Sequence, residues 1–322
     1  MDEAGIHPER IRLLNGRPEA KGQYVLYWMQ QSQRPEWNQA LSFAIAQANR
    51  LQQPLVVAFG LTADYPEANL RHYAFMLDGF SETQSTLAEM GIRMAVQTGD
   101  PADVALKVGK KASLIVCDRG YLRHQKAWRK KVAEMARCKV VQVESDVVVP
   151  VDAVSDKAEY AARTIRPKIQ RLLPGYLVGL DETMPKVPSL YVDIESLDLS
   201  APDLVLDSLP VSREVGASPF FKGGTSEAKR RFLKFLETSL ESYDRNSNQP
   251  QTEDISHTSP YLHFGQISPL WLALQVQNFD GAPDIAKDAF LEQLIVRREL
   301  AMNFVNFTPA YDSVECLSEW AV

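Results

Sequence analysis

The residues best suited to binding chemistry lie in segment 255–269, which reads ISHTSPYLHFGQISP. Ser259 is a residue type that often caps a helix, and Pro260 fits the first helical position because no N–H donor is needed there. The first turn of such a helix presents free backbone amides to an anion. Ser256 and Thr258 add two hydroxyl groups beside it. The segment therefore predicts a phosphate-binding helix start, although a capping serine is also typical of helices that bind no ligand.

A second segment, residues 290–304, places cations inside an otherwise apolar helix and reads FLEQLIVRRELAMNF. Its apolar residues recur at helical spacing, with Arg297 and Arg298 between them. Cations in such a helix must meet anions or water. An anionic ligand is one interpretation. An internal ion pair of Arg297 with a carboxylate of the same segment, such as Glu292 or Glu299, is the other.

The elements that must position these side chains differ between the two halves of the chain. Apolar runs in the first half are expected to form strands at residues 24–29, 54–61, 93–98, 113–118 and 139–144. Helical patterns separate them around residues 37–50, 71–90, 101–110 and 126–137. This alternation predicts an α/β fold, a doubly wound parallel sheet with helices on both faces, over residues 1–150. Ligands of such sheets bind beyond the carboxyl ends of the strands, and no GxGxxG or P-loop sequence is present.

The second half reads as a connection followed by helices. Residues 151–218 are rich in Pro, Asp and Leu, which predicts a long inter-domain connector on the surface. Within it, EYAARTIRPKI is expected to form a helix that stops before Pro167. Residues 219–322 carry apolar side chains at helical spacing and predict an all-α region.

Charge and hydropathy narrow the classes of function. The net charge is −6 over 322 residues, so a nucleic-acid site must be a local basic patch. Residues 119–139 and 157–171 are two candidate patches, although a solvated helix face explains each of them as well. No apolar run reaches the length of a membrane span, and residues 1–23 lack a signal-peptide pattern. A cytoplasmic protein is expected.

Cysteine and histidine spacing gives no support for a metal site. Cys117, Cys138 and Cys316 are widely separated and form no CxxC pair. None of the five histidines has metal-ligand spacing with these cysteines or with another histidine. Unpaired thiols fit a reducing compartment, and no metal is expected.

Several longer motifs, together with the two segments above, resemble one known family. They are YWMQQSQRPEWNQAL at 27–41, RHYAFMLDGF at 71–80, CDRGYLRHQKAWR at 117–129 and EYAARTIRPKIQRLLPGYL at 159–177. With Tyr243, twelve residues before Ile255, they resemble class II cyclobutane pyrimidine dimer DNA photolyases of the photolyase/cryptochrome family over about residues 24–320. The resemblance implies a Rossmann-like N-terminal domain followed by an all-α flavin-binding domain.

The resemblance also implies light-driven repair. In the family a reduced FAD passes an electron to a cyclobutane pyrimidine dimer in DNA, the dimer splits, and the electron returns. The damaged bases reach the cofactor by base flipping, and their poor stacking lowers the cost of extrusion, which gives selectivity without sequence reading. The family pattern assigns five residues to the FAD, mainly around its phosphates: Tyr243, Ser256, Thr258, Ser259 and Arg297.

Several positions depart from the family pattern. The lesion-contacting glutamate falls on Gln293, whose carboxamide can hydrogen-bond but carries no charge. Glu292 lies beside it, but neighbouring helix positions point about 100° apart, so Glu292 is not a ready substitute. The family often has several basic residues after the tyrosine, and here they are reduced to Arg245. Arg245 and Arg298 are candidate DNA contacts. The family can also carry an antenna chromophore in the sheet domain, which no residue here identifies.

Photolyases continue well beyond the segment that matches YDSVECLSEWA. The resemblance therefore describes a C-terminally shortened chain with an incomplete flavin-binding domain, and a monomer is expected. Three functions remain open at this point. The first is repair of DNA containing cyclobutane pyrimidine dimers, impaired in the shortened chain. The others are a cryptochrome-like flavin light sensor without repair activity and an inactive photolyase fragment.

Overall fold

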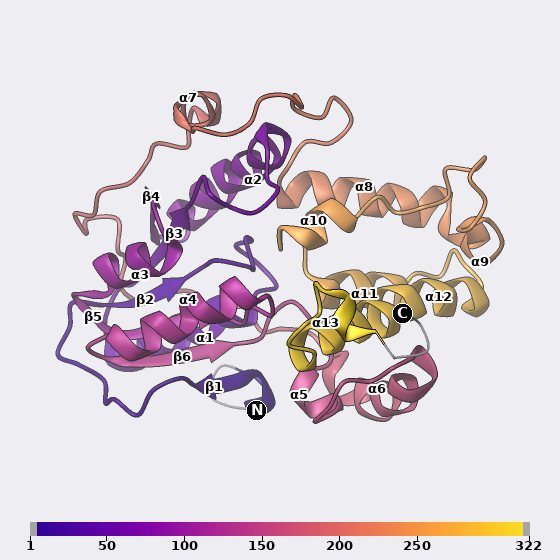
Figure 1. Ribbon diagram of the computed structural model, residues 1–322, viewed down its shortest axis with the longest axis horizontal. Coiled ribbons are helices and arrows are strands. Elements are labelled where there is room, and N and C mark those ends of the chain that lie inside the picture. The colour runs from indigo at the N-terminus through magenta and orange to yellow at the C-terminus, as the bar shows by residue number, and fades with distance from the viewer. Residues whose placement is uncertain (1–4, 318–322) are drawn as a thin grey trace.

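The computed structural model describes residues 5–317, so Trp320, near the end of the region that resembles the family, lies outside the described residues. In Figure 1, one side of the molecule contains a sheet with its flanking helices. The other side contains a separate group of helices. The first half of the sequence forms the sheet, and the second half forms most of the separate group of helices.

The sheet has six strands in the order β1-β6-β5-β2-β3-β4. Five of them run parallel: β2 (Tyr24–Trp28), β3 (Leu55–Leu61), β4 (Arg93–Thr98), β5 (Ala112–Asp118) and β6 (Lys139–Val143). Their bounds differ from the predicted ones by at most one residue at each end. The sixth, β1 (Ile11–Leu13), pairs antiparallel with β6 and was not predicted, because three residues are too few to show a periodic pattern.

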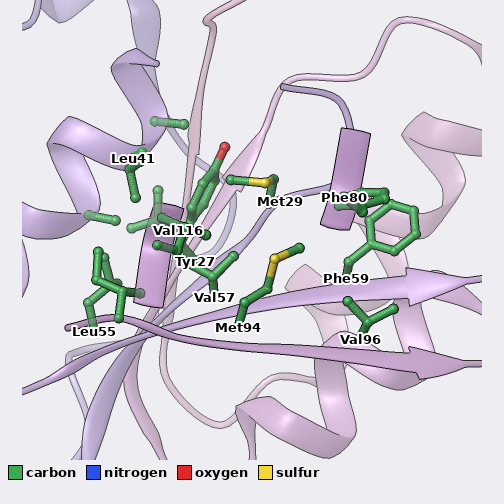
Figure 2. Packing of buried hydrophobic residues seen from close by; sticks show 14 of the residues in the cluster. Tyr27, Met29, Leu41, Leu55, Val57, Phe59, Phe80, Met94, Val96 and Val116 are labelled. Carbon is green, nitrogen blue, oxygen red and sulfur yellow. The ribbon is translucent and has the colours of Figure 1, made fainter. Parts of the chain in front are cut away.

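Helices cover both faces of this sheet. They are α1 (Gln39–Leu51), α2 (Leu70–Glu89), α3 (Pro101–Gly109) and α4 (Arg123–Met135). Tyr27 joins the apolar cluster of α1 and α2, whereas Leu26 and Trp28 join that of α3 and α4. Side chains of β2 alternate in this way because a strand has a period of two, and all are buried because both faces are covered. Figure 2 shows the first cluster, with Val57 and Met94 close to Tyr27.

A second apolar core lies among the helices of the C-terminal half. They are α8 (Thr225–Thr238), α9 (Tyr243–Asn246), α10 (Ser259–His263), α11 (Pro269–Gln277), α12 (Asp284–Leu291) and α13 (Arg298–Phe307). Between α12 and α13 the chain forms a π-helical segment, Glu292–Arg297. The rings of Phe232, Trp271 and Phe290 meet inside this core. Short 3-10 turns occur at Pro8–Arg10, Leu240–Ser242 and Val314–Cys316.

The expected connector, residues 151–218, is partly helical. It contains α5 (Val151–Val154), α6 (Ala162–Tyr176) and α7 (Pro202–Ser208). Ile165 and Ile169 of α6 are buried in the same core as Phe232. The prediction that this helix stops before Pro167 is wrong, because Pro167 and Pro174 both lie inside α6. The two prolines are on its exposed side, so packing of the buried side offsets the backbone hydrogen bonds that they remove.

The rest of the connector runs along the outer edge of the sheet. Val96 of the edge strand β4 donates its N–H to the Ser196 hydroxyl at 3.0 Å and accepts the N–H of Leu197 at 2.8 Å. These bonds satisfy backbone groups that an edge strand would otherwise leave open. Farther along, α7 packs against α2. This part of the connector therefore belongs to the sheet domain, and α6 belongs with the C-terminal helices.

Candidate functional site

The hydroxyl-rich segment forms a turn in front of α10. This helix begins at Ser259, with Thr258 in the N-cap position, and no side chain caps its first turn. The prediction that Ser259 is the N-cap and Pro260 the first helical residue is wrong, because the helix begins one residue earlier. Ser256 and Thr258 instead hydrogen-bond to each other, with 2.8 Å between the two hydroxyl oxygens. The Ser259 side chain is exposed and has no capping role.

The turn directs its hydroxyls to different sides. His257 has a φ of 53°, a left-handed conformation that few residues other than glycine adopt. Ser256 lines a cavity of about 780 Å³ beside α8. Basic side chains of α8 and the carboxylates of residues 253–254 line the same cavity. Ser259 lines another cavity of about 440 Å³, between α10, α13 and the sheet domain, together with Arg298. The predicted phosphate contacts Ser256 and Ser259 therefore lie in separate cavities.

Tyr243 is the first residue of α9 and is buried in the helical core. Its ring meets Phe235 and Phe290 edge-on, at centroid distances of 5.7 and 5.3 Å. Burial raises the pKa of its phenol. Within residues 5–317 its hydroxyl has no hydrogen-bond partner. Tyr243 is therefore a core residue and not a surface tyrosine, and its hydroxyl can still donate to a ligand.

Arg297 lies at the end of the π-helical segment and is about half exposed. Its Nε atom is 3.4 Å from Oε1 of Glu292. The interpretation of an internal ion pair is therefore confirmed for Glu292. It is wrong for Glu299, which is buried and accepts the backbone N–H of Val148 and Val149.

Glu292 itself is held from a second side. Arg166 of α6 donates from Nε to one carboxylate oxygen at 3.0 Å and from Nη2 to the other at 2.7 Å. The Arg166 hydrogen bonds, with help from Arg297, lower the pKa of Glu292. This carboxylate is ionised and already paired, so it is not a free substitute for a lesion-contacting glutamate. The adjacent Gln293 side chain is exposed.

The two candidate DNA contacts lie in different environments. Arg245 is exposed on α9, with Nε 3.9 Å from the carboxylate of Asp244. Arg298 is largely enclosed, and its Nη1 donates to the backbone carbonyl of Asp146 at 2.6 Å. Burial lowers the pKa of Arg298. Because Arg298 bridges α13 to the sheet domain, its place does not favour contact with DNA.

Sequence reasoning missed the residue that connects α10 to the sheet domain. Arg34 is 1% exposed and donates to the carbonyls of Ser145 and Gly265, both at 2.9 Å, and to the Asp146 carboxylate at 2.8 Å. Gly265 follows α10, has a φ of 68°, and a Cβ there would lie 2.0 Å from the carbonyl oxygen of Gln31. Arg34 lies inside a motif quoted for the family resemblance, but sequence alone does not reveal that its guanidinium is buried.

A cavity lies at the carboxyl ends of β2 and β3, where the parallel sheet is expected to bind ligands. Its volume is about 240 Å³, and it is lined by aromatic and amide side chains, among them Phe59, Trp128, Gln33 and His263. The Oε1 atoms of Gln31 and Gln33 are buried there and have no hydrogen-bond partner among the described residues. These two acceptors suit a ligand that offers N–H or O–H groups.

A buried carboxylate holds the loop that forms one wall of this cavity. Asp118 accepts the backbone N–H of Gln30 and Gln31, each at 2.8 Å, and the hydroxyl of Tyr27 at 2.6 Å. Burial, reinforced by the negative charge of Asp146, raises the pKa of Asp118. The bonded backbone amides fix the loop at the switch point between β2 and β5.

Two further classes of feature are absent from residues 5–317. No helix in this part of the chain combines the length and the apolar character required to cross a membrane. No group of three His, Cys, Asp or Glu side chains in it is arranged to hold a metal ion. Cys117 and Cys138 are buried as free thiols, and burial raises the pKa of Cys117 to about 12.

Comparison with known proteins identifies relatives of this chain. The sequence profile of the DNA photolyase family matches residues 25–189. A deoxyribodipyrimidine photo-lyase of Methanothermobacter thermautotrophicus is 46% identical over 98% of this chain and 69% of its own length. The photo-lyases of Arabidopsis thaliana and Potorous tridactylus are 32% and 31% identical, over 98% and 99% of this chain and 66% and 60% of theirs.

Solved structures share the fold. A bacterial class III photolyase of Agrobacterium tumefaciens superposes with a TM-score of 0.67 at 18% identity, over 90% of this chain and 60% of its own. An archaeal photolyase of Sulfolobus tokodaii with two FAD molecules gives 0.65 at 17% identity, over 89% and 60%. At such low identity the likeness concerns the fold alone. The chain spans 60% to 69% of the length of these five proteins.

Proposed function

Because the chain belongs to the DNA photolyase family, we propose that it functions in deoxyribodipyrimidine photo-lyase-type repair of DNA. The observation that carries this proposal is the 46% identity with the M. thermautotrophicus photo-lyase across 98% of this chain. The substrate would be DNA that contains cyclobutane pyrimidine dimers. Reduced FAD, when bound, supplies the electron that splits the dimer in light. The residues of the chain must bind the FAD and hold the lesion close to it.

For the FAD phosphates we propose donors from Tyr243, Ser256, Ser259 and Arg297. Because Ser256 and Ser259 line separate cavities, they would approach the diphosphate from different sides of the turn. The free hydroxyl of Tyr243, the exposed Ser259 and the half-exposed Arg297 support this assignment, because phosphate oxygens accept hydrogen bonds from such groups. Thr258 is buried and bonded to Ser256. Its proposed role is therefore to shape the turn, with its backbone facing the cofactor.

Within the family we propose the class II cyclobutane pyrimidine dimer type, supported by the four long motifs. The Gln293 carboxamide would donate to a thymine carbonyl of the dimer. Glu292 would not replace it, because Arg166 already occupies both of its carboxylate oxygens. Arg245, which is exposed, would contact a DNA phosphate. We no longer propose Arg298 as a DNA contact.

For the cavity at the ends of β2 and β3 we propose a light-harvesting antenna chromophore. The aromatic lining suits a planar ring system, and the unpaired Gln31 and Gln33 oxygens suit donors on its edge. In the S. tokodaii photolyase, the presence of two FAD molecules implies a novel light-harvesting cofactor. A cavity of about 240 Å³ accommodates a ring system more readily than a whole dinucleotide.

The FAD assignment is tested by flavin absorbance per chain after purification and removal of free FAD. We expect flavin in the wild-type protein and a loss of about tenfold in affinity for Tyr243→Phe, which removes one hydroxyl that donates to a charged group. Tyr160→Phe is the matched control, because Tyr160 is an exposed tyrosine on the approach to α6. Equal flavin content in both variants would remove Tyr243 from the site.

A further inference from the structure

Glu292 is contacted by two arginines of unequal geometry. Arg166 grips the carboxylate with two hydrogen bonds, of 2.7 and 3.0 Å. Arg297 approaches the Oε1 atom of Glu292 with its Nε at the longer distance of 3.4 Å. The bidentate pair is the stronger of the two, because two parallel N–H···O bonds match the carboxylate geometry. Arg166 is therefore the main partner of Glu292, and Arg297 is a secondary one.

The π-helical segment brings Glu292 and Arg297 together. They are its first and last residues, five positions apart. In an α-helix such positions point about 140° apart. A π-helix forms i→i+5 bonds and brings them to the same side, and π-helical turns are frequent at functional sites. The segment also carries the exposed Gln293, so Arg297 lies within one turn of the proposed lesion contact.

The charges of the three side chains leave one cation in excess. Glu292 carries one negative charge, and the two hydrogen bonds from Arg166 satisfy both of its oxygens. The Arg297 side chain is 55% exposed, against 35% for Arg166 and 25% for Glu292. Its guanidinium thus keeps N–H donors that face outward. An exposed arginine with free donors is suited to a phosphate group.

We propose that Arg166 and Glu292 are positioning residues that keep the Arg297 guanidinium oriented and available for a phosphate group. Arg166 neutralises the charge of Glu292. Glu292 then orients Arg297 through one contact and leaves the other N–H donors of Arg297 available. This inference rests on the proposed function. The phosphate is a diphosphate oxygen of FAD or a phosphodiester of the DNA next to the lesion, and the experiments below separate these two sources.

The first experiment uses pyrophosphate as the probe and measures its affinity for the full chain by calorimetry. Arg166→Gln leaves Glu292 without its main partner, so Glu292 should pair tightly with Arg297 and pyrophosphate affinity should fall about tenfold. In the double variant Arg166→Gln/Glu292→Gln the competing negative charge is gone, while a carboxamide oxygen can still accept the contact that orients Arg297, so affinity should recover. A purely structural role for Arg166 predicts no recovery. Arg166→Lys, which keeps the charge, covers the case in which Arg166→Gln does not fold, and should lose less affinity than Arg297→Gln.

The second experiment distinguishes the sources of phosphate. If FAD is the source, Arg166→Gln should lower flavin absorbance per chain, and the double variant should restore it. If DNA is the source, the affinity of Arg166→Gln for a single-stranded oligonucleotide with one thymine dimer should depend less on salt than the affinity of the wild type does. The slope of log K against log salt should then be smaller by about 0.7, the value of one phosphate contact on a single strand.

Arg171→Gln is the matched control, because Arg171 is exposed on α6 and five positions from Arg166, which turns it away from Glu292. It should leave pyrophosphate affinity unchanged. Pyrophosphate binding requires neither flavin nor repair. The pyrophosphate affinities of the variants therefore test the inference separately from the proposed function. Failure of the wild-type chain to bind pyrophosphate, or failure of Glu292→Gln to rescue Arg166→Gln, would overturn the inference.

Discussion

The guanidinium of Arg34 donates a hydrogen bond of 2.9 Å to the backbone carbonyl of Gly265, although 231 positions separate the two residues. Arg34 comes from the loop after β2, and Gly265 follows the short helix α10 that begins with Ser259. The bond therefore fixes the helix that carries a proposed phosphate contact against the sheet domain. Asp146 and Ser145 accept from the same guanidinium, so one buried cation holds three segments.

Replacing Arg34 by methionine should destabilise the protein by about 3 kcal/mol or more, because the change removes the charged donor of Asp146 and the donor of two buried carbonyls. Urea unfolding provides the free energy. Arg213→Met is the control, since Arg213 pairs with Asp207 on the exposed surface and should cost less than about 1 kcal/mol. Similar losses for both variants would contradict the role assigned to Arg34.

Ser259→Ala should change the free energy of unfolding by less than about 0.5 kcal/mol, because no capping hydrogen bond is lost. Its flavin affinity should nevertheless fall. Ser268→Ala supplies the contrast, since the Ser268 side chain caps α11 by accepting the N–H of Trp271 at 3.3 Å, and its loss should cost about 1 kcal/mol. A Ser259 variant that loses stability and keeps its flavin would reverse this assignment.

Glu299 should make stability fall as the pH rises. Burial is the main cause that raises the pKa of this carboxyl in the folded protein to about 8, against 4.5 as its ordinary value. Between these two values the folded state holds a proton that the unfolded state has released. The free energy of unfolding should therefore decrease by up to about 1.4 kcal/mol per pH unit from this group, and level off above pH 8.

Glu299→Gln removes this titration while keeping an oxygen that can accept the N–H of Val148 and Val149. Unfolding free energies measured from about pH 5.5 to about 7.5, inside the window between the two pKa values, should show a smaller decrease in the variant than in the wild type. Identical pH profiles would mean that Glu299 is ionised in the folded protein.

Gln293→Glu should raise the rate of dimer splitting in a form that binds flavin. A protonated carboxyl group donates a stronger O–H hydrogen bond to a thymine carbonyl than the N–H of a carboxamide, which corresponds to about tenfold in rate if the bond strengthens during the reaction. The initial rate per bound flavin is the quantity to measure. Glu292→Gln is not expected to raise it, because Glu292 is occupied by Arg166. A slower Gln293→Glu variant would show that the carboxamide is suited to its task.

The strands of the sheet domain were predictable because they are buried on both faces, and such strands have nearly continuous apolar sequences. Most of its helices were predictable from apolar residues at helical spacing. β1 was missed because Ile11–Leu13 is too short, and α6 was cut at Pro167 because propensity rules do not include the packing of Ile165 and Ile169. Local rules describe a segment alone. The tertiary core decides whether a proline is tolerated.

The candidate site was only partly predictable. The hydroxyl segment, Tyr243 and the arginine helix were identified from types and spacing, and the ion pair of Arg297 with Glu292 was one of two stated interpretations. Arg34 and Asp118 were not assigned roles, and Arg166 was included only in the candidate basic patch 157–171. The contacts of all three depend on partners more than 80 positions away. The π-helical turn has no sequence signal in a single chain, yet it decides which side chain Arg297 meets.

Light-dependent splitting of a thymine dimer is the measurement that decides whether this chain supports repair. The assay compares the 322-residue chain with a chimera that adds the remaining C-terminal part of the M. thermautotrophicus photo-lyase, of which this chain spans 69%. Both proteins are supplied with chemically reduced FAD and illuminated with near-ultraviolet light. We expect dimer splitting by the chimera in light only, and its loss in Arg297→Met. A chimera that retains stoichiometric flavin and splits no dimer in light would contradict the repair function and favour a light sensor.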